Sequence, residues 1–223
     1  MQPESDLIIW LMRFVLASAS PRRAELLKAA GFTFETLPVE VDERPRPDEP
    51  PAAYVRRLAA EKSARALGVV SGVSPVAADQ DVVVLGADTA VIVDGEILGK
   101  PRDDDDARAM LWRLSARQHE VVTGLSLRNA ADEVGRVEAT SVWFAPLTPD
   151  AVAWYVSTGE GRDKAGAYAI QGFGSRFIPR IEGSYSNVVG LPVATVADLL
   201  RQLGGKRLAG PGGPGTHRRA GGV

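Results

Sequence analysis

The sequence predicts a mixed α/β fold in which helices flank one curved or split sheet. Three observations carry this prediction: runs of β-branched residues typical of buried strands, amphipathic segments with helical spacing, and a later change to the two-residue period of antiparallel strands. With 223 residues, 45% of them hydrophobic and 24% charged, the chain can bury one substantial core. We expect one domain over residues 13–206, preceded by an extension over 1–12 and followed by a flexible Gly/Pro-rich tail over 207–223.

The first predicted unit is a strand, a turn of small residues and a helix. Residues 14–17 suit a buried strand, and Ser20 suits the N-cap of a helix that Gly31 would end. Free amides in the first helical turn and the helix dipole attract anions. Arg22 and Arg23 add two guanidinium groups suited to phosphate oxygens. Both a phosphate site and an ordinary turn with solvated arginines explain this stretch.

A second strand, a loop and a long helix are predicted next. The strand covers 32–37, and a proline-rich acidic loop over 38–51 contains Glu43. The helix over 52–67 places its apolar residues on one stripe, and Lys62 lies on that same stripe. Lys62 therefore either extends from the edge of the helix to solvent or faces an anionic group.

A buried strand and a hairpin follow a Gly/Ser/Pro-containing connection over 68–80. The β-branched run over 81–88 is typical of a strand buried on both faces. It predicts Asp88 at the carboxyl end of the strand, where α/β proteins place groups that face ligands. A hairpin turn at 94–95 then leads to Lys100 in a loop.

The next helix opens with four aspartates over 103–106. They could suggest a metal site, but Asp103 is a good N-cap and acidic side chains suit a helix N-terminus, so capping already explains them. The period then changes to two, and a long antiparallel hairpin is predicted from strands over 119–129 and 136–147.

The last third of the chain mixes short elements with glycine-rich loops. Thr148 is expected to cap a short helix. The glycine-rich segment over 159–175 lacks the GK[ST] ending of a P-loop. A strand over 176–183, a loop over 184–192 and a final helix over 194–205 complete the prediction.

Composition limits the possible chemistry and partners. The formal net charge of −2 argues against stable nucleic-acid binding. The absence of cysteine excludes disulfides, thiolate metal sites and a cysteine nucleophile, and fits a reducing cytoplasm. The apolar stretch over 7–19 contains Arg13 and follows an acidic segment, so we expect neither a signal peptide nor a membrane span. With two histidines, catalysis must depend on Asp, Glu, Lys, Arg and the backbone.

The cations and carboxylates singled out above suggest one shared ligand. A polyphosphate would be held partly by basic side chains and partly by a divalent metal bound to carboxylates. Phosphoryl chemistry needs this arrangement because charge must be neutralised while a water attacks in line. The candidate groups are Arg22, Arg23, Glu43, Lys62, Asp88 and Lys100.

Seven segments, in order along the chain, carry a resemblance to a known family. They are LASASPRRAELL, the VDE of residues 41–43, GADTAV, GKP, RLSARQHEVVTG, DKAGAYAIQG and GSYSNVVGLP. Together they resemble the Maf family of nucleoside triphosphate pyrophosphatases, also called septum-formation proteins. The likeness extends from about Phe14 to Leu203.

The resemblance implies hydrolysis between the α and β phosphates of a nucleoside triphosphate, which yields a nucleoside monophosphate and pyrophosphate. It also implies a divalent cation, Mg²⁺ or Mn²⁺, a homodimer, and a fold similar to the inosine triphosphate pyrophosphatases, with a cleft between two lobes. By matched motif, Asp88 corresponds to the family's proton acceptor, and we expect Glu43 and Asp88 to hold the metal. The other matched active-site positions are Ser18, Arg22, Arg23, Lys62 and Lys100.

The resemblance extends to substrate choice. SPRR together with GADT and AIQG resembles the subgroup that acts on dTTP and UTP, and points to Arg22, Thr89 and Gln171 as specificity positions. The 7-methyl-GTP subgroup typically differs at the first arginine and after Asp88. The Gln171 amide offers a donor and an acceptor, which complement O4 and N3–H of uracil or thymine.

The family resemblance carries a second functional hypothesis. Besides housecleaning of nucleotide pools, it implies a role in cell division, which a nucleotide-sensing protein could exert from the same pocket without turnover. A positioned proton acceptor at Asp88 favours an enzyme, because binding a polyphosphate does not require one.

Overall fold

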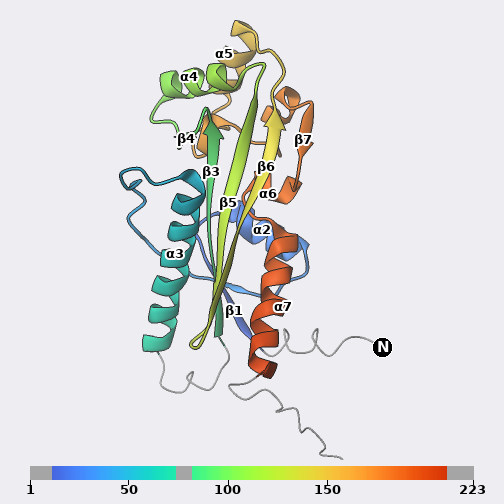
Figure 1. The fold of residues 1–223 in the computed structure, drawn as a ribbon. Coiled ribbons are helices and arrows are strands. Elements are labelled where there is room, and N and C mark those ends of the chain that lie inside the picture. The colour runs from blue at the N-terminus through green and yellow to red at the C-terminus, as the bar shows by residue number, and fades with distance from the viewer. Residues whose placement is uncertain (1–11, 74–81, 210–223) are drawn as a thin grey trace, which may run out of the picture.

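The computed structural model describes residues 12–73 and 82–209 (Figure 1). The predictions for residues 1–11, for 74–80 and for the tail from 210 onward lie outside the described residues. The described residues form a seven-stranded mixed sheet flanked by helices, which confirms the predicted mixed α/β class. None of the helices within these residues is long and apolar enough to cross a membrane.

The sheet has the order β2-β1-β3-β5-β6-β7, with β4 paired to β3. β1 runs parallel to β2 and β3, and the remaining pairs are antiparallel. The strands are β1 (Arg13–Ala17), β2 (Glu35–Thr36), β3 (Val82–Val93), β4 (Glu96–Leu98), β5 (Gln118–Arg128), β6 (Glu133–Trp143) and β7 (Arg180–Glu182).

Helices cover both faces of the long strands, with α3 on one side and α7 on the other (Figure 1). α4 and α5 pack at the far end of the same strands, near β4 (Figure 1). The α-helices are α2 (Pro21–Ala29), α3 (Pro51–Val73), α4 (Asp104–Leu114), α5 (Pro149–Ser157), α6 (Tyr185–Val189) and α7 (Val193–Ala209). Two short 3₁₀ segments, η2 (Ala165–Ala167) and η3 (Phe173–Phe177), lie between α5 and β7.

Side chains along β3 alternate between the two faces, and this alternation separates the core into clusters. Leu85 and Ala87 pack with α2 and α7, whereas Val84 and Ala90 belong to clusters that pack against α3. A further cluster contains Val91 and packs against α4 and α5. The core therefore lies on both faces of the sheet, with a further cluster at the end of β3 that packs against α4 and α5.

Two of the predicted caps make the expected side-chain hydrogen bond. The Asp103 side chain accepts a hydrogen bond from the amide of Asp106, so capping accounts for the acidic start of α4. The Thr148 side chain caps α5 in the same way. The hairpins β3–β4 and β5–β6 are also confirmed, although β6 begins at Glu133 and ends at Trp143 rather than covering the predicted 136–147.

Several other predicted boundaries are wrong. The final helix, predicted to end at 205, continues to Ala209. The strand predicted over 32–37 is reduced to Glu35–Thr36, because Phe32 and Phe34 pack into the core while only the later residues pair with β1. The strand predicted over 176–183 is likewise reduced to β7, after η3. α3 continues through the start of the predicted 68–80 connection. The loop predicted over 184–192 contains α6, because the Ser184 side chain caps it.

The position of Asp88 within its strand also differs from the prediction. β3 continues to Val93, since residues after Asp88 remain apolar and pair with β5, so Asp88 is in the middle of the strand rather than at its carboxyl end. The parallel neighbour β1, however, ends at Ala17, opposite Gly86. Asp88 therefore lies just beyond the carboxyl end of β1, where none of the strands in the described residues pairs with that edge of β3.

Candidate active site

A cleft of about 590 Å³ opens where β1 ends beside β3. Segments from distant parts of the chain line it: the β1–α2 turn, the loop before α3, α3 itself, the middle of β3, the loop after β4, and the segment from Asp163 to Gln171. Every site residue predicted from the sequence lies in its lining. These residues are Ser18, Arg22, Arg23, Glu43, Lys62, Asp88, Thr89, Lys100 and Gln171.

The turn between β1 and α2 forms one wall of the cleft. Ser20 is the N-cap of α2 but makes no side-chain cap hydrogen bond, and its amide instead donates to Ser18 Oγ at 3.2 Å. Arg22 reaches across the cleft, where Nη1 lies 3.3 Å from Asp163 Oδ2, and its side chain is 28% exposed. The amides of the first helical turn and one accessible guanidinium group thus face the same space, as an anion site requires.

Arg23 lies at the floor of the cleft, where it binds groups of the protein rather than serving as a phosphate ligand. Its Nε donates to the Gly190 carbonyl at 2.9 Å, and Nη1 donates to the Ala87 carbonyl at 2.9 Å and to Ser18 Oγ at 3.2 Å. Nη2 donates to Thr89 Oγ1 at 3.1 Å. Most of its hydrogen-bonding capacity is therefore used inside the protein, and the two arginines, which sequence reasoning treated as equivalent, have different surroundings.

Thr89, predicted as a specificity position, belongs to this same floor. Its hydroxyl lies 2.9 Å from Thr123 Oγ1 and 3.2 Å from the Gly190 carbonyl. These contacts, with the one from Arg23, hold the hydroxyl in place. Any influence of Thr89 on the substrate therefore includes an effect on the position of Arg23.

Lys62 connects two carboxylates at the centre of the cleft. Its Nζ lies 2.6 Å from Asp88 Oδ1 and 2.7 Å from Glu43 Oε1. The Lys62 and Asp88 side chains are 10% and 13% exposed, whereas that of Glu43 is 58% exposed. Of the two alternatives left open by the sequence, the structure shows the second, in which Lys62 faces anionic groups.

Glycines in β3 and β5 allow this contact, because they let α3 approach the sheet closely. A Cβ atom at Gly86 would lie 2.1 Å from the carbonyl oxygen of Ala59, and one at Gly124 would lie 2.3 Å from that of Val55. Asp88 points to the same face of β3 as Gly86, two residues earlier. The close packing of α3 therefore brings Lys62 within reach of Asp88.

The pKa values of the two carboxylates are shifted in opposite directions. Burial raises the pKa of Asp88 above its ordinary value, although the positive charges of Lys62 and Arg23 oppose the increase. Burial also acts to raise the pKa of Glu43, but the hydrogen bond from Lys62 and the charges of Lys62, Lys100 and Arg23 together hold it below the ordinary value. Asp88 is thus the more readily protonated member of the pair, which suits a proton acceptor.

The loop that contains Gln171 is held by a residue that sequence reasoning missed. The Glu160 carboxylate accepts hydrogen bonds from the amides of Phe173 and Gly174 at 2.8 and 3.0 Å, and from the Tyr155 hydroxyl at 2.8 Å. Gly172 provides the space, since a Cβ there would lie 1.7 Å from Glu160 Oε1. The GFG sequence after Gln171 is the signal that could have indicated a carboxylate packed against this turn.

The two central carboxylates fit a divalent ion that is shared with a substrate. Glu43 and Asp88 already converge on one cationic atom, Lys62 Nζ. Within residues 12–73 and 82–209, no group of three or more His, Cys, Asp or Glu side chains could hold a metal alone. Mg²⁺ is commonly bound by one or two carboxylates together with substrate phosphates and water, so this donor set suits an ion that arrives with a nucleotide.

Comparisons with known proteins agree on one family. A family model described as Maf-like protein matches residues 13–203. A dTTP/UTP pyrophosphatase of Anaeromyxobacter sp. (strain Fw109-5) is 51% identical over 208 residues, which is 91% of this chain and 95% of that protein. A dTTP/UTP pyrophosphatase of Anaeromyxobacter dehalogenans (strain 2CP-1 / ATCC BAA-258) is 53% identical, over 86% of this chain and 94% of that one.

More distant proteins align along most of the chain as well. A dTTP/UTP pyrophosphatase of Syntrophus aciditrophicus is 44% identical over 89% of this chain and 93% of its own length. The solved structure of the Staphylococcus aureus Ham1 protein aligns with a TM-score of 0.49 and 15% identity, over 87% of this chain and 99% of that one. The family assignment depends on the sequence matches alone.

Proposed function

The chain belongs to the Maf family, and on this premise we propose that it hydrolyses dTTP and UTP to the nucleoside monophosphate and pyrophosphate, with a divalent metal ion. The observation that carries the proposal is the convergence of Lys62, Asp88 and Glu43 in one cleft that also contains Arg22, Lys100 and Gln171. The relatives named dTTP/UTP pyrophosphatase support the substrate and the reaction.

In the proposed complex, the triphosphate lies between the first turn of α2 and the loop after β4. The amides of that turn and the Arg22 guanidinium bind phosphate oxygens, and Lys100, which is exposed in the cleft lining, neutralises further negative charge. Arg23 keeps the floor in place through Gly190, Ala87 and Thr89. These residues position the nucleotide without taking part in proton transfer.

Asp88 accepts the proton of the attacking water. Lys62 donates a hydrogen bond to Oδ1, so we assign the water to Oδ2. The water oxygen forms a bond to the α-phosphorus, the bond from that phosphorus to the oxygen bridging the α and β phosphates breaks, and pyrophosphate leaves. Lys62 keeps Asp88 oriented and stabilises its charge before the proton arrives.

Glu43 and Asp88 would hold Mg²⁺ or Mn²⁺ together with substrate oxygens. When bound, the ion supplies positive charge that neutralises the phosphates and favours attack at phosphorus. The exposed position of Glu43 beside the buried Asp88 leaves it accessible to an ion that enters with the nucleotide.

We assign the protein to the cytoplasm and expect a homodimer without stable nucleic-acid binding. The absence of cysteine in the whole chain and the formal net charge of −2 support the compartment and the lack of a polyanion partner. The dimer follows from the resemblance to the Maf family, and light scattering of the purified chain tests it.

A panel of triphosphates tests the reaction and its substrates. With Mg²⁺ or Mn²⁺, we expect dTTP and UTP to be consumed faster than CTP, ATP, GTP and 7-methyl-GTP, with one pyrophosphate released per monophosphate. EDTA should stop the reaction, because the carboxylates then lack the ion that neutralises the phosphates. Orthophosphate as the first product would place cleavage at the wrong bond. Tight binding of dTTP without product would favour the sensing protein instead.

Gln171→Glu tests recognition of the base. The substitution removes the amide donor to O4 of uracil or thymine and adds a negative charge, so kcat/KM for UTP is expected to fall about 10-fold, consistent with ~1.4 kcal/mol for a lost hydrogen bond. A carboxylate accepts from the amino group of cytosine, so the ratio of CTP to UTP hydrolysis should rise. Steady-state kinetics on both nucleotides measures this ratio, and an unchanged ratio would count against recognition of the base by Gln171.

A further inference from the structure

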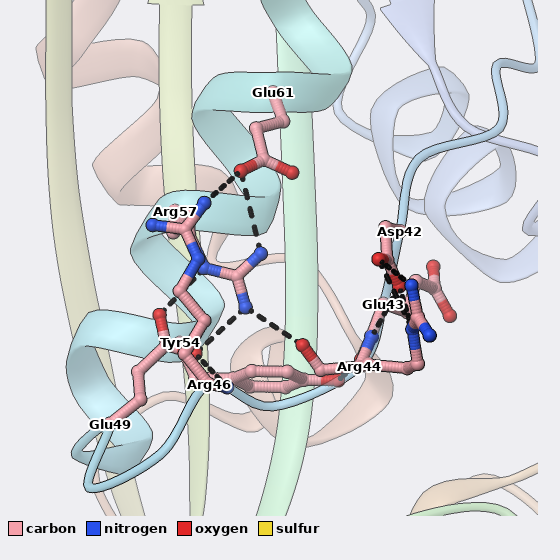
Figure 2. A network of polar contacts seen from close by, with 8 residues as sticks. All are labelled: Asp42, Glu43, Arg44, Arg46, Glu49, Tyr54, Arg57 and Glu61. Atoms are coloured by element: carbon pink, nitrogen blue, oxygen red, sulfur yellow. Dashed lines mark hydrogen bonds and ion pairs between the residues drawn. The ribbon is translucent and has the colours of Figure 1, made fainter.

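The loop that brings Glu43 to the cleft has no helix or strand of its own. This segment, residues 37–50, connects β2 to α3 and is called the Glu43 loop below. Contacts with α3, shown in Figure 2, replace the missing secondary structure. The position of Glu43 therefore depends on side chains outside the cleft.

Arg57, on α3, makes several of these contacts. Its Nε lies 2.6 Å from Glu49 Oε1 and its Nη2 lies 2.7 Å from Glu49 Oε2, which is a bidentate pair. Nη2 also donates to the Arg44 carbonyl at 3.2 Å, and Nη1 donates to Glu61 at 3.4 Å. Arg57 thus holds both the far end of the Glu43 loop, at Glu49, and the carbonyl of Arg44, the residue after Glu43.

Three further contacts complete what we call the Arg57 network, which comprises Arg57, Glu49, Glu61, Arg46 and Tyr54. Arg46 donates to Glu49 through its amide at 3.1 Å and to Glu61 through Nη2 at 3.3 Å. The Tyr54 hydroxyl donates to the carbonyl of Glu43 itself at 2.9 Å. Successive carbonyls, at positions 43 and 44, are therefore both bound by side chains of α3 (Figure 2).

The Arg57–Glu49 pair is more shielded than an ordinary surface ion pair. The two side chains are 13% and 9% exposed, and the bidentate geometry limits their motion. The hydrogen bond from Arg57 lowers the pKa of Glu49 to about 2. Because this pKa is depressed, the contribution to stability is complete above about pH 4.5, the ordinary value for Glu, and is lost only as the pH falls toward 2. The pair is therefore intact at neutral pH.

The same helix also provides Lys62, the cationic partner of the Glu43 carboxylate. α3 therefore determines the positions of both members of the Glu43–Lys62 pair: Lys62 directly, and Glu43 through Tyr54 and Arg57. The Glu43 side chain itself is 58% exposed and has little packing that could hold it otherwise.

We propose that Arg57 is a positioning residue, which holds the main chain at Glu43 and Arg44 so that the Glu43 carboxylate stays beside Lys62 and is ready for the divalent ion. Arg57 is absent from the cleft lining and touches no reacting group. This inference rests on the proposed role of Glu43 in metal binding.

Arg57→Lys and Glu49→Gln test the proposal without removing a large side chain. Lysine keeps the charge but cannot make the bidentate contact. Glutamine keeps the shape of the glutamate side chain but replaces one carboxylate oxygen with an NH2 group and removes the charge. We expect the Mg²⁺ concentration for half-maximal pyrophosphate release from dTTP to rise about 10-fold, as for the loss of a residue that orients a metal ligand. At saturating Mg²⁺ the turnover should approach that of the wild type.

Arg13→Lys is the matched control. Arg13 and Glu35 form another bidentate pair, with distances of 2.9 and 2.7 Å, between β1 and β2 and outside the cleft lining. This variant should leave the Mg²⁺ requirement unchanged. Thermal unfolding of all three variants separates a general loss of stability from a local effect.

A double-mutant cycle with Glu43→Gln distinguishes positioning from a structural role. If Arg57 acts through Glu43, Arg57→Lys should raise the Mg²⁺ requirement in the wild-type background but have little further effect in the Glu43→Gln background. The Glu43→Gln variants are measured at higher enzyme concentration, because their activity is expected to be lower. Equal effects in both backgrounds would overturn the proposal, and so would a wild-type Mg²⁺ requirement in both folded variants.

Amide hydrogen exchange provides a readout that does not depend on activity. Peptides that cover residues 39–49 should exchange faster in Arg57→Lys than in the wild type or in Arg13→Lys, without nucleotide or metal. Unchanged exchange would contradict the role of Arg57 in holding the loop. If the wild type releases no pyrophosphate from dTTP or UTP, the proposed function fails, while the exchange experiment still decides whether Arg57 fixes this segment.

Discussion

Asp88→Asn is expected to lower turnover of dTTP by roughly 10²–10⁴-fold, because the variant cannot accept the proton of the attacking water. Asparagine has nearly the same shape and can still accept a hydrogen bond from Lys62, so substrate binding should change less than turnover. Rapid-quench measurement of pyrophosphate release separates the two. Near-normal turnover would exclude Asp88 as the proton acceptor.

Stability gives an independent check on this variant. Burial raises the pKa of Asp88, so this group stabilises the fold most at low pH, and its contribution falls as the pH rises through the folded-state pKa. Removing the charge should therefore leave the melting temperature at neutral pH unchanged or higher. Asp94→Asn is the matched control, since Asp94 is exposed in the turn after the same strand and pairs with Arg117. The control should keep wild-type turnover.

The pH dependence of kcat/KM follows from the same carboxyl. The acid limb should lie above the pH at which an ordinary aspartate titrates, since burial raises the pKa of Asp88. Two other groups are excluded as the source of this limb. The pKa of Glu43 is held below its ordinary value. His119 is buried outside the cleft lining, so it does not contact the nucleotide. The residual activity of Asp88→Asn should lack this limb, which controls for titration of the nucleotide itself.

Lys62→Met is expected to lower kcat/KM by about 10²–10³-fold, comparable to the loss of one positioned donor in other active sites. Methionine has a similar length but no charge, so Asp88 and Glu43 lose the cation between them. The pKa of Asp88 should then rise further, and the acid limb of kcat/KM should move to higher pH. Kinetics at several pH values measures both effects.

The same substitution should also destabilise the fold at neutral pH, by about 1–3 kcal/mol for the unpaired buried group. This loss should shrink as the pH falls and Asp88 becomes protonated. Lys28→Met is the control, because Lys28 is exposed in the last turn of α2 and lies outside the cleft lining. Wild-type kinetics in Lys62→Met would show that the central cation has no role in the reaction.

Local sequence signals predicted much of the fold. Ser20 before Pro21, Asp103 before an acidic turn and Thr148 before Pro149 each mark a helix start that the structure contains. These signals work because a cap involves only a few neighbouring residues. The alternation over 119–147 likewise predicted the β5–β6 hairpin, although not the exact ends of its strands.

Contacts between distant segments were not predictable in the same way. The role of Arg23 depends on Gly190, Ala87 and Thr89, none of which adjoins it in sequence. The Arg57 network joins a proline-rich loop to a helix through side chains that resemble ordinary surface charges in the sequence. Neither arrangement has a periodic signature, because each depends on how elements pack.

By itself, the sequence determined the fold class, most helix starts, and, through its resemblance to the Maf family, the residues expected at the site. Only the tertiary structure decided that Asp88 lies in mid-strand beside the end of β1, and that Lys62 lies between two carboxylates. The physical reason is that caps and periodicity arise within a few residues. The face of β3 that meets α3, and the distance between them, depend on strand register and on the space that Gly86 and Gly124 provide.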